Sequence, residues 1–247
     1  MRERGYRLCD QCGAVENPAV ARFRLCGGCM TTQYCSQDCQ KAHWASHKVI
    51  CQHTVAQQQP SSYSSHSSQY ANDDYEETVK ALRKYTSTHT ALLGWAGFQA
   101  LRLKKVPANI RHSVLVINLT RSSSSQYHHS TSRHNSSRTH ENNKDKKFAF
   151  HSTQILPLAS YLTDPLILAD IARRSQRSRA SGGVGCLIVV LRVVPYGADI
   201  NALNNGGEIN QVVPVEVDRV EGIQWAERAD WESVLREALE SGREFRV

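Results

Sequence analysis

The stretch that decides the fold is residues 9–51, CDQCGAVENPAVARFRLCGGCMTTQYCSQDCQKAHWASHKVIC. Seven cysteines and one histidine give it the pattern C-x2-C-x13-C-x2-C-x5-C-x3-C-x7-H-x3-C. Zinc takes four ligands and prefers thiolate and imidazole, so these side chains suit two closed, structural sites with no open position for substrate. The predicted ligands are Cys9, Cys12, Cys26, Cys29, Cys35, Cys39, His47 and Cys51.

The spacing divides the ligands into four chelating pairs. Cys9–Cys12 and Cys26–Cys29 are C-x2-C knuckles, in which a tight turn aims two thiolates at one point. Cys35–Cys39 and His47–Cys51 are four residues apart, which places both members of a pair on one face of a helix. Spacing alone leaves two arrangements open, an interleaved one and a sequential one in which the first four ligands hold one ion.

A disulfide framework is the alternative for a segment so rich in cysteine. The segment holds an odd number of cysteines, and the histidine falls where an eighth ligand is needed. Met1–Arg7 is charged and has no apolar run of the kind found in a secretory signal. We therefore expect zinc-bound thiolates in an intracellular protein, either nuclear or cytoplasmic.

The most specific run is Tyr34–Gln40 (YCSQDCQ), followed by Trp44, His47-Lys48 and Cys51. It resembles the MYND zinc finger pattern Y-C-S-x2-C-Q-x3-W-x2-H-K-x2-C. The resemblance implies a small α+β finger with two cross-braced zinc ions. The implied first set is Cys9, Cys12, Cys35 and Cys39, and the implied second set is Cys26, Cys29, His47 and Cys51.

The resemblance also implies a protein partner that docks through a short proline-containing peptide, with Gln40 and Trp44 lining the groove. These two residues are four apart, so they share a helix face. An indole face suits proline, and the Thr31–Tyr34 strand offers an edge to an extended peptide. The alternative is that Trp44 forms the core of a module too small to have much other core.

After Cys51 the composition divides the chain into a linker, an insertion and a second domain. Residues 52–72 are rich in Gln, Ser and Tyr and read as a flexible linker. Residues 122–147 are crowded with Ser, His, Asn and Lys, which predicts a disordered insertion. Residues 73–247 then form a separate α+β domain of unknown function.

Within that domain the hydrophobic pattern predicts alternating helices and strands. Helices are expected over Asp74–Leu103 as one or two segments, from Pro165 toward Arg179, and over Trp231–Ser241. Strands are expected at Ser113–Thr120, Phe148–Leu156, Cys186–Val194 and Ile209–Val217. Cys186–Val194 is the most apolar and is expected to be central, whereas Pro214 favours an edge position for the last strand.

The net charge of +7 is spread along the chain, and no apolar run approaches the ~20 residues that span a membrane. One basic cluster, Arg173, Arg174, Arg177 and Arg179, lies at a predicted helix end. There a solvated cluster that complements the helix dipole is favoured over a nucleic-acid surface.

No nucleophile elbow, phosphate-binding loop or dinucleotide fingerprint is present in the sequence, and we expect no enzyme. The prediction is an adaptor whose finger captures a peptide. The alternatives are a nucleic-acid-associated regulator and an uncharacterised enzyme in residues 73–247.

Overall fold

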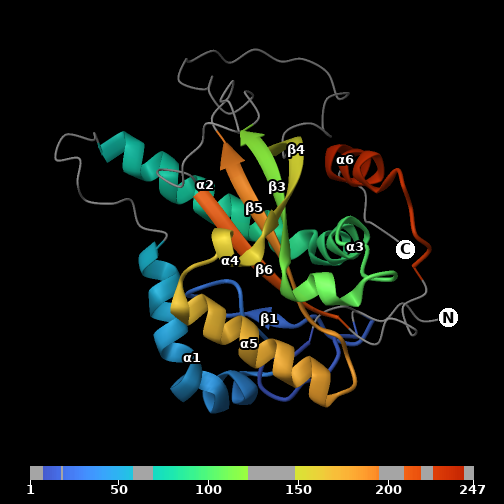
Figure 1. Ribbon diagram of the computed structural model, residues 1–247. Helices are drawn as coiled ribbons and strands as arrows, with labels where there is room; N and C mark the ends of the chain where they lie inside the picture. Colours follow the sequence, from blue (N-terminus) through green and yellow to red (C-terminus); the bar gives the residue numbers. More distant parts are fainter. Residues whose placement is uncertain are drawn as a thin grey trace.

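The computed structural model describes residues 8–17, 19–57, 69–121, 148–194, 209–217 and 225–241. The elements in chain order are β1 (Arg24–Leu25), β2 (Gln33–Tyr34), α1 (Gln37–Gln57), α2 (Gln69–Thr88), α3 (Thr90–Ala100), the 3-10 helix η1 (Pro107–Arg111), β3 (Ser113–Arg121), β4 (Phe148–Pro157), α4 (Leu158–Tyr161), α5 (Pro165–Ala180), β5 (Gly185–Val194), β6 (Ile209–Val217) and α6 (Trp231–Ser241). The first three elements form the finger, and the others form an α+β domain around one mixed sheet (Figure 1).

The larger sheet has the strand order β4-β3-β5-β6. β3 and β5 are parallel, and the two outer strands pair antiparallel to them. Every residue of β5 is buried, which confirms its predicted central place. β6 is an edge strand of this sheet, and an edge tolerates Pro214 because proline has no N–H to donate.

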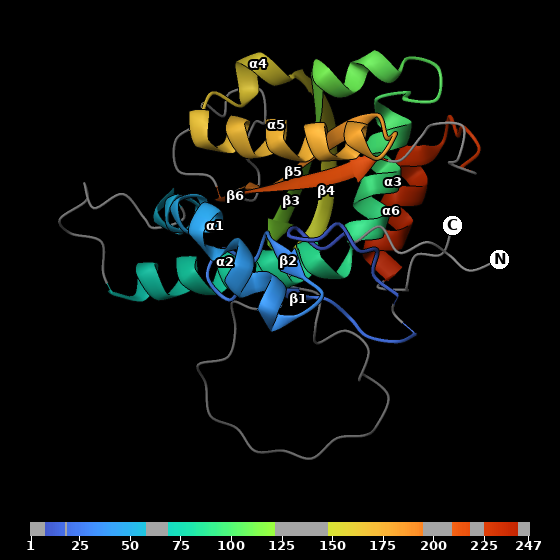
Figure 2. The ribbon, with the colours of Figure 1, turned by 90° about the horizontal axis from the view of Figure 1, so that it is seen from below.

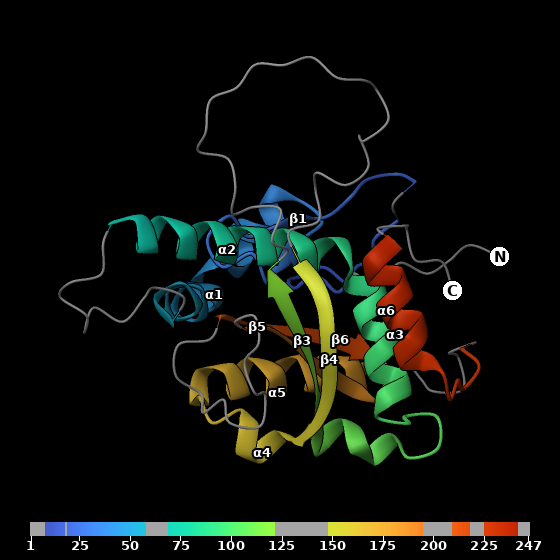
Figure 3. The same ribbon diagram turned by 90° about the horizontal axis from the view of Figure 1, so that it is seen from above.

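Helices cover both faces of this sheet (Figures 2 and 3). On one face, α2, α3 and α6 pack against alternate strand residues such as Ile117 and Leu191. On the other face, α4 and α5 cover the intervening residues, including Val116 and Val190. The central strands β3 and β5 are hydrophobic on both faces because both faces are buried, as expected for a sheet between two helical layers.

The predicted helical region from Asp74 to Leu103 is two helices, and it begins earlier than expected, at Gln69. The break lies at His89, so the region is two segments rather than one. α3 approaches β5 closely at Gly97, where a Cβ atom would lie 2.7 Å from the Leu187 side chain. Glycine is therefore required by packing at this contact.

α5 begins where its capping signal places it. The Asp164 carboxylate accepts hydrogen bonds from the backbone N–H groups of Leu166 and Ile167, at 2.9 and 3.1 Å. Pro165 occupies the first helical position, where no backbone donor is needed. An N-cap of this kind satisfies N–H groups that have no partner within the helix.

The predicted linker was too long at both ends, because α1 continues to Gln57 and α2 begins at Gln69. The extension of α1 is held by a contact with the α+β domain, since His53 Nε2 lies 2.6 Å from Asp164 Oδ2. A long-range contact of this kind overrides a composition that reads as linker. Residues 58–68 lie outside the described residues.

The predicted insertion at residues 122–147 also lies outside the described residues. The strands that flank it, β3 and β4, pair antiparallel from Ser113↔Pro157 to Arg121↔Phe148. The chain therefore returns to the same ladder after residues 122–147. Within the described ranges, no helix has both the length and the apolar character needed to cross a bilayer.

Candidate metal centre and interaction surface

The finger gathers its eight predicted ligands into two groups of four. Within each group the ligand atoms all lie within 4.8 Å of one another. The first group is Cys9, Cys12, Cys35 and Cys39, and the second is Cys26, Cys29, His47 and Cys51. Of the two arrangements that spacing left open, the structure has the interleaved one.

The separations between ligand atoms fit tetrahedral zinc. Zn–S bonds of about 2.3 Å place two sulfurs of a tetrahedron about 3.8 Å apart. The Sγ atoms of Cys12 and Cys35 are 3.6 Å apart, and those of Cys26 and Cys51 are 3.7 Å apart. All eight cysteines of the chain are free, so no disulfide framework is present. The donor set and its dimensions are those of two structural zinc ions.

The electrostatics of the second group also favour a bound cation. The interaction between Cys26 and Cys29 raises the pKa of the Cys26 thiol and lowers that of Cys29. Thiols packed this closely compete for protons, and a divalent cation relieves the competition because it binds thiolates. Arg83 on α2 lies near this group. Burial lowers the pKa of its guanidinium, and the negative charges of Cys29 and Cys51 partly oppose that change.

The two groups differ in burial. All four ligands of the second group are buried, and they contribute three members of the finger's hydrophobic cluster. In the first group Cys9 is buried and Cys39 is half-buried, but Cys12 and Cys35 are exposed. The second group is therefore the core of the finger, and the first lies at its surface.

His47 is oriented by a residue that the sequence analysis did not identify. Its Nε2 lies 3.5 Å from Cys29 Sγ, on the side of the ligands, and its Nδ1 lies 3.4 Å from the hydroxyl of Thr32. Thr32 and His47 are both buried. A hydroxyl oxygen that accepts a hydrogen bond from Nδ1–H leaves Nε2 free to bind metal, which is how neighbouring groups orient a metal-binding histidine.

Thr32→Val removes this hydroxyl and keeps the shape of the side chain. We expect the affinity for one of the two zinc ions to fall about tenfold or more, the usual effect of losing such a partner. Chelator competition on the zinc-loaded full chain measures it. Thr32→Ser is the matched control and should keep the wild-type affinity, and equal weakening by the two variants would show that the hydroxyl has no orienting role.

Trp44 and Gln40 lie on α1, outside both ligand groups. The Trp44 side chain remains 43% exposed, and its ring is edge-on to the His47 imidazole with centroids 6.2 Å apart. Gln40, one turn earlier, is half-buried. The alternative that Trp44 forms the core is wrong, because Tyr34 and the second group of ligands occupy that place.

The predicted strand edge is not open where it was expected. The backbone N–H and carbonyl of Gln33 point away from β1, and both are hydrogen-bonded to Asp10. Its N–H donates to the Asp10 carboxylate at 2.8 Å, and its carbonyl accepts from the Asp10 N–H at 2.9 Å. Since pairing alternates along antiparallel strands, Leu25 on β1 directs its backbone groups away from β2. The remaining edge of this hairpin is thus that of β1.

Asp10 also joins the finger to the α+β domain that follows it. Its side chain is buried, and Oδ1 lies 2.5 Å from Arg174 Nη1. Arg177 donates to the Asp10 carbonyl oxygen at 2.5 Å and pairs with Glu216 of β6. Figure 1 shows α1 alongside α5, the helix that carries both arginines. The finger therefore packs against the domain through buried charge.

This contact also corrects the interpretation of the arginine cluster as a solvated helix end. Arg174 is buried, and the carboxylates of Asp10 and Asp170 raise its pKa although burial opposes them. Burial alone would raise the pKa of Asp170, but the neighbouring arginines lower it to about 2. Arg173, Arg174 and Arg177 are occupied by carboxylates and carbonyls, which leaves little of their charge for phosphate groups.

Cys186 lies on β5, apart from both ligand groups, as predicted. Burial raises the pKa of its thiol to about 12, so it is protonated at neutral pH and unreactive.

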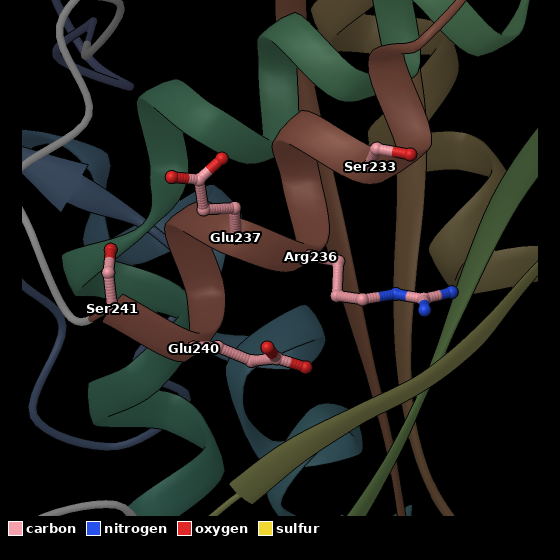
Figure 4. Close-up of a pocket in the computed structure, with 5 residues that line it drawn as sticks. All are labelled: Ser233, Arg236, Glu237, Glu240 and Ser241. Carbon is pink, nitrogen blue, oxygen red and sulfur yellow. The ribbon is translucent and has the colours of Figure 1, made fainter.

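A depression of about 370 Å³ lies along α6 and is lined by Ser233, Arg236, Glu237, Glu240 and Ser241 (Figure 4). All of its lining residues come from one helix, and Arg236 lies over the Phe150 ring, 5.1 Å from its centroid. Side chains from several elements do not converge here. The depression therefore gives no argument for a catalytic site.

Residues 9–51 match the protein family described as MYND finger. The MYND-type zinc finger protein samB of Aspergillus clavatus is 44% identical over 52 residues, 20% of this chain and 8% of that protein. Egl nine homolog 1 of Mus musculus is 36% identical over 50 residues, 20% of this chain and 11% of that protein. SET domain-containing protein 14 of Caenorhabditis elegans is 38% identical over 50 residues, with the same coverage of 20% and 11%.

The chain therefore spans only a small part of the length of the curated relatives it matches, and no solved structure shows significant similarity to it. Residues 9–51 are a MYND-type zinc finger, a zinc module of protein–protein interaction.

Proposed function

We propose that the protein is an adaptor that binds a partner protein through a short proline-containing peptide and performs no catalysis itself. The observation that carries the proposal is the exposed Trp44. It lies on α1 between two of the predicted zinc ligands, Cys39 and His47, which fix this part of the helix. A large aromatic side chain left 43% exposed on a rigid support is a favourable docking surface for proline.

The neighbouring residues supply polar contacts for an extended peptide. Gln40 precedes Trp44 by one turn on α1, so its amide is on the same face and is able to hydrogen-bond a peptide backbone. The outer edge of β1, at Leu25, offers backbone groups for strand addition. Because Asp10 already binds Gln33, we assign the peptide to β1 and not to β2.

The α+β domain has a supporting role in this proposal, because it holds the finger through α5. The alternative of a nucleic-acid-associated regulator is weakened, because Arg174 and Arg177 of the basic cluster pair with carboxylates. A peptide docked on an indole is expected to show weak dependence on salt, whereas phosphate contacts show a steep one.

Trp44→Ala is expected to weaken peptide binding by about 2 kcal/mol, or about 30-fold in Kd, the effect typical of a central aromatic contact. The probe is a fluorescent peptide selected from a displayed library of random peptides with a fixed central proline, and anisotropy on the full chain measures its affinity. Zinc content should be unchanged, because Trp44 is not a ligand.

Val49→Ala is the matched control, because Val49 is also exposed on α1 but points to another side of the helix. It should leave the affinity for the selected peptide unchanged. Failure of the library to yield any peptide dependent on Trp44, with both zinc ions in place, would contradict the proposed function.

A further inference from the structure

The two zinc sites differ in their exposure to oxidants. Cysteines bound to zinc are thiolates, and oxidation of a thiolate depends on how accessible it is. Cys12 and Cys35 of the first site are exposed, whereas the second site has no exposed ligand. The Sγ atoms of Cys12 and Cys35 are 3.6 Å apart, and the two residues come from segments that are distant in sequence.

We propose that the first site is an oxidation-sensitive site, which hydrogen peroxide opens by joining Cys12 to Cys35. The Cys12 thiolate attacks one peroxide oxygen, so that an S–O bond forms, the O–O bond breaks and hydroxide leaves. The Cys35 thiolate then attacks the Cys12 sulfur, and the S–S bond forms as a second hydroxide leaves. Water results when both hydroxides are protonated. Two thiolates are oxidised, one peroxide is reduced, and the site keeps too few ligands to retain its ion.

Packing protects the second site from the same reaction. Cys26, Cys29 and Cys51 are buried in the finger's hydrophobic cluster. Gly28 lies so close to Cys51 that a Cβ at this position would be 2.8 Å from its Sγ atom. Peroxide therefore reaches the first site while the second remains closed.

Opening the first site also affects the contact with α5. Asp10 lies inside the knuckle between Cys9 and Cys12, and the carbonyl oxygens of Cys9 and Asp10 both accept hydrogen bonds from Arg177. A disulfide at Cys12 pulls this knuckle out of its zinc-bound shape. The ion pair between Asp10 and Arg174 then loosens, so that oxidation releases the finger from the domain.

The experiment treats the zinc-loaded full chain with hydrogen peroxide and follows zinc by native mass spectrometry, disulfides by peptide mapping and α5 by hydrogen exchange. We expect loss of one of the two zinc ions, a Cys12–Cys35 disulfide and faster exchange in Pro165–Ala180. Dithiothreitol with added zinc should reverse all three changes. Simultaneous loss of both ions, a first disulfide within the second site, or unchanged exchange in α5 after the loss of one ion would overturn the proposal.

Two variants separate the proposed reaction from general damage. Cys35→His keeps a zinc-binding side chain but cannot form the disulfide, so a variant that still binds two ions should retain them under peroxide. Cys186→Ala changes the cysteine outside both sites and should leave the response as in the wild type. If Cys35→His does not bind two ions, the disulfide map of the peroxide-treated wild-type chain still shows whether Cys12 and Cys35 are joined.

Discussion

Cys29→Ser is expected to release one zinc ion and unfold the finger. Cys29 is fully buried, its Sγ lies 3.5 Å from His47 Nε2, and it belongs to the cluster that serves as the finger's core. Structural zinc contributes on the order of 10 kcal/mol to the folding of such modules, which have too little apolar core to fold without it. Native mass spectrometry and circular dichroism of the full chain measure the zinc content and the lost structure.

The control for this variant is Cys186→Ala, which changes a buried cysteine of β5 that belongs to neither site. It should keep both ions and the folded finger, at a modest cost from the lost packing. If Cys29→Ser held two ions with a native spectrum, the assignment of Cys29 as a ligand would be wrong.

Asp10→Asn is expected to destabilise the protein by about 3 kcal/mol without removing a zinc ligand. The substitution keeps the size of the side chain but removes the charge that faces Arg174 at 2.5 Å in a buried position. Loss of one partner of a buried ion pair is costly because the other charge stays buried with less compensation. Asp170 remains near Arg174 and limits the effect. Chemical denaturation of the zinc-loaded chain measures the change.

Asp38→Asn is the matched control, because Asp38 is an exposed carboxylate of the same finger. Its effect should stay within about 0.5 kcal/mol, as is usual for a surface substitution. Equal effects of the two substitutions would show that the buried pair between finger and domain contributes nothing specific to stability.

The zinc sites and most of the fold could be predicted from the sequence because their signals are local. Ligand spacing reports directly on chelation, and runs such as Cys186–Val194 report on burial. Pro165 and Asp164 likewise mark a helix start through their immediate neighbours. Each ligand pair, buried strand and helix start depends on a few neighbouring residues, and the structure has all of them, whereas spacing alone left the arrangement of the ligand pairs open.

The contacts between the finger and the domain could not be predicted, since they join residues far apart in the chain. Asp10 and Arg174 are each ordinary charged residues in sequence, and only the fold brings them together in a buried place. The same holds for His53 and Asp164, which extend α1 beyond the predicted finger boundary. The position of Asp10 between the ligands Cys9 and Cys12 was a signal in the sequence, but the sequence does not show which residue pairs with it.

Thr32 was missed for a different reason. It lies in the finger, three residues after a ligand, but its hydroxyl gains meaning only from the orientation of His47. Ligand spacing identifies the residues that touch the metal, and it contains no information on the groups that orient them. The exposure of Trp44 was likewise undecided in the sequence, because burial in so small a module depends on how the two zinc sites fill its core.

Cadmium-113 substitution of the full chain, followed by NMR correlation from each cadmium to its cysteine protons, tests the two interleaved ligand sets most directly. We expect two cadmium signals. One should couple to Cys9, Cys12, Cys35 and Cys39, and the other to Cys26, Cys29 and Cys51, with His47 as its fourth ligand. Coupling of one cadmium to the first four cysteines of the chain would contradict the interleaved finger and the interaction surface built on it.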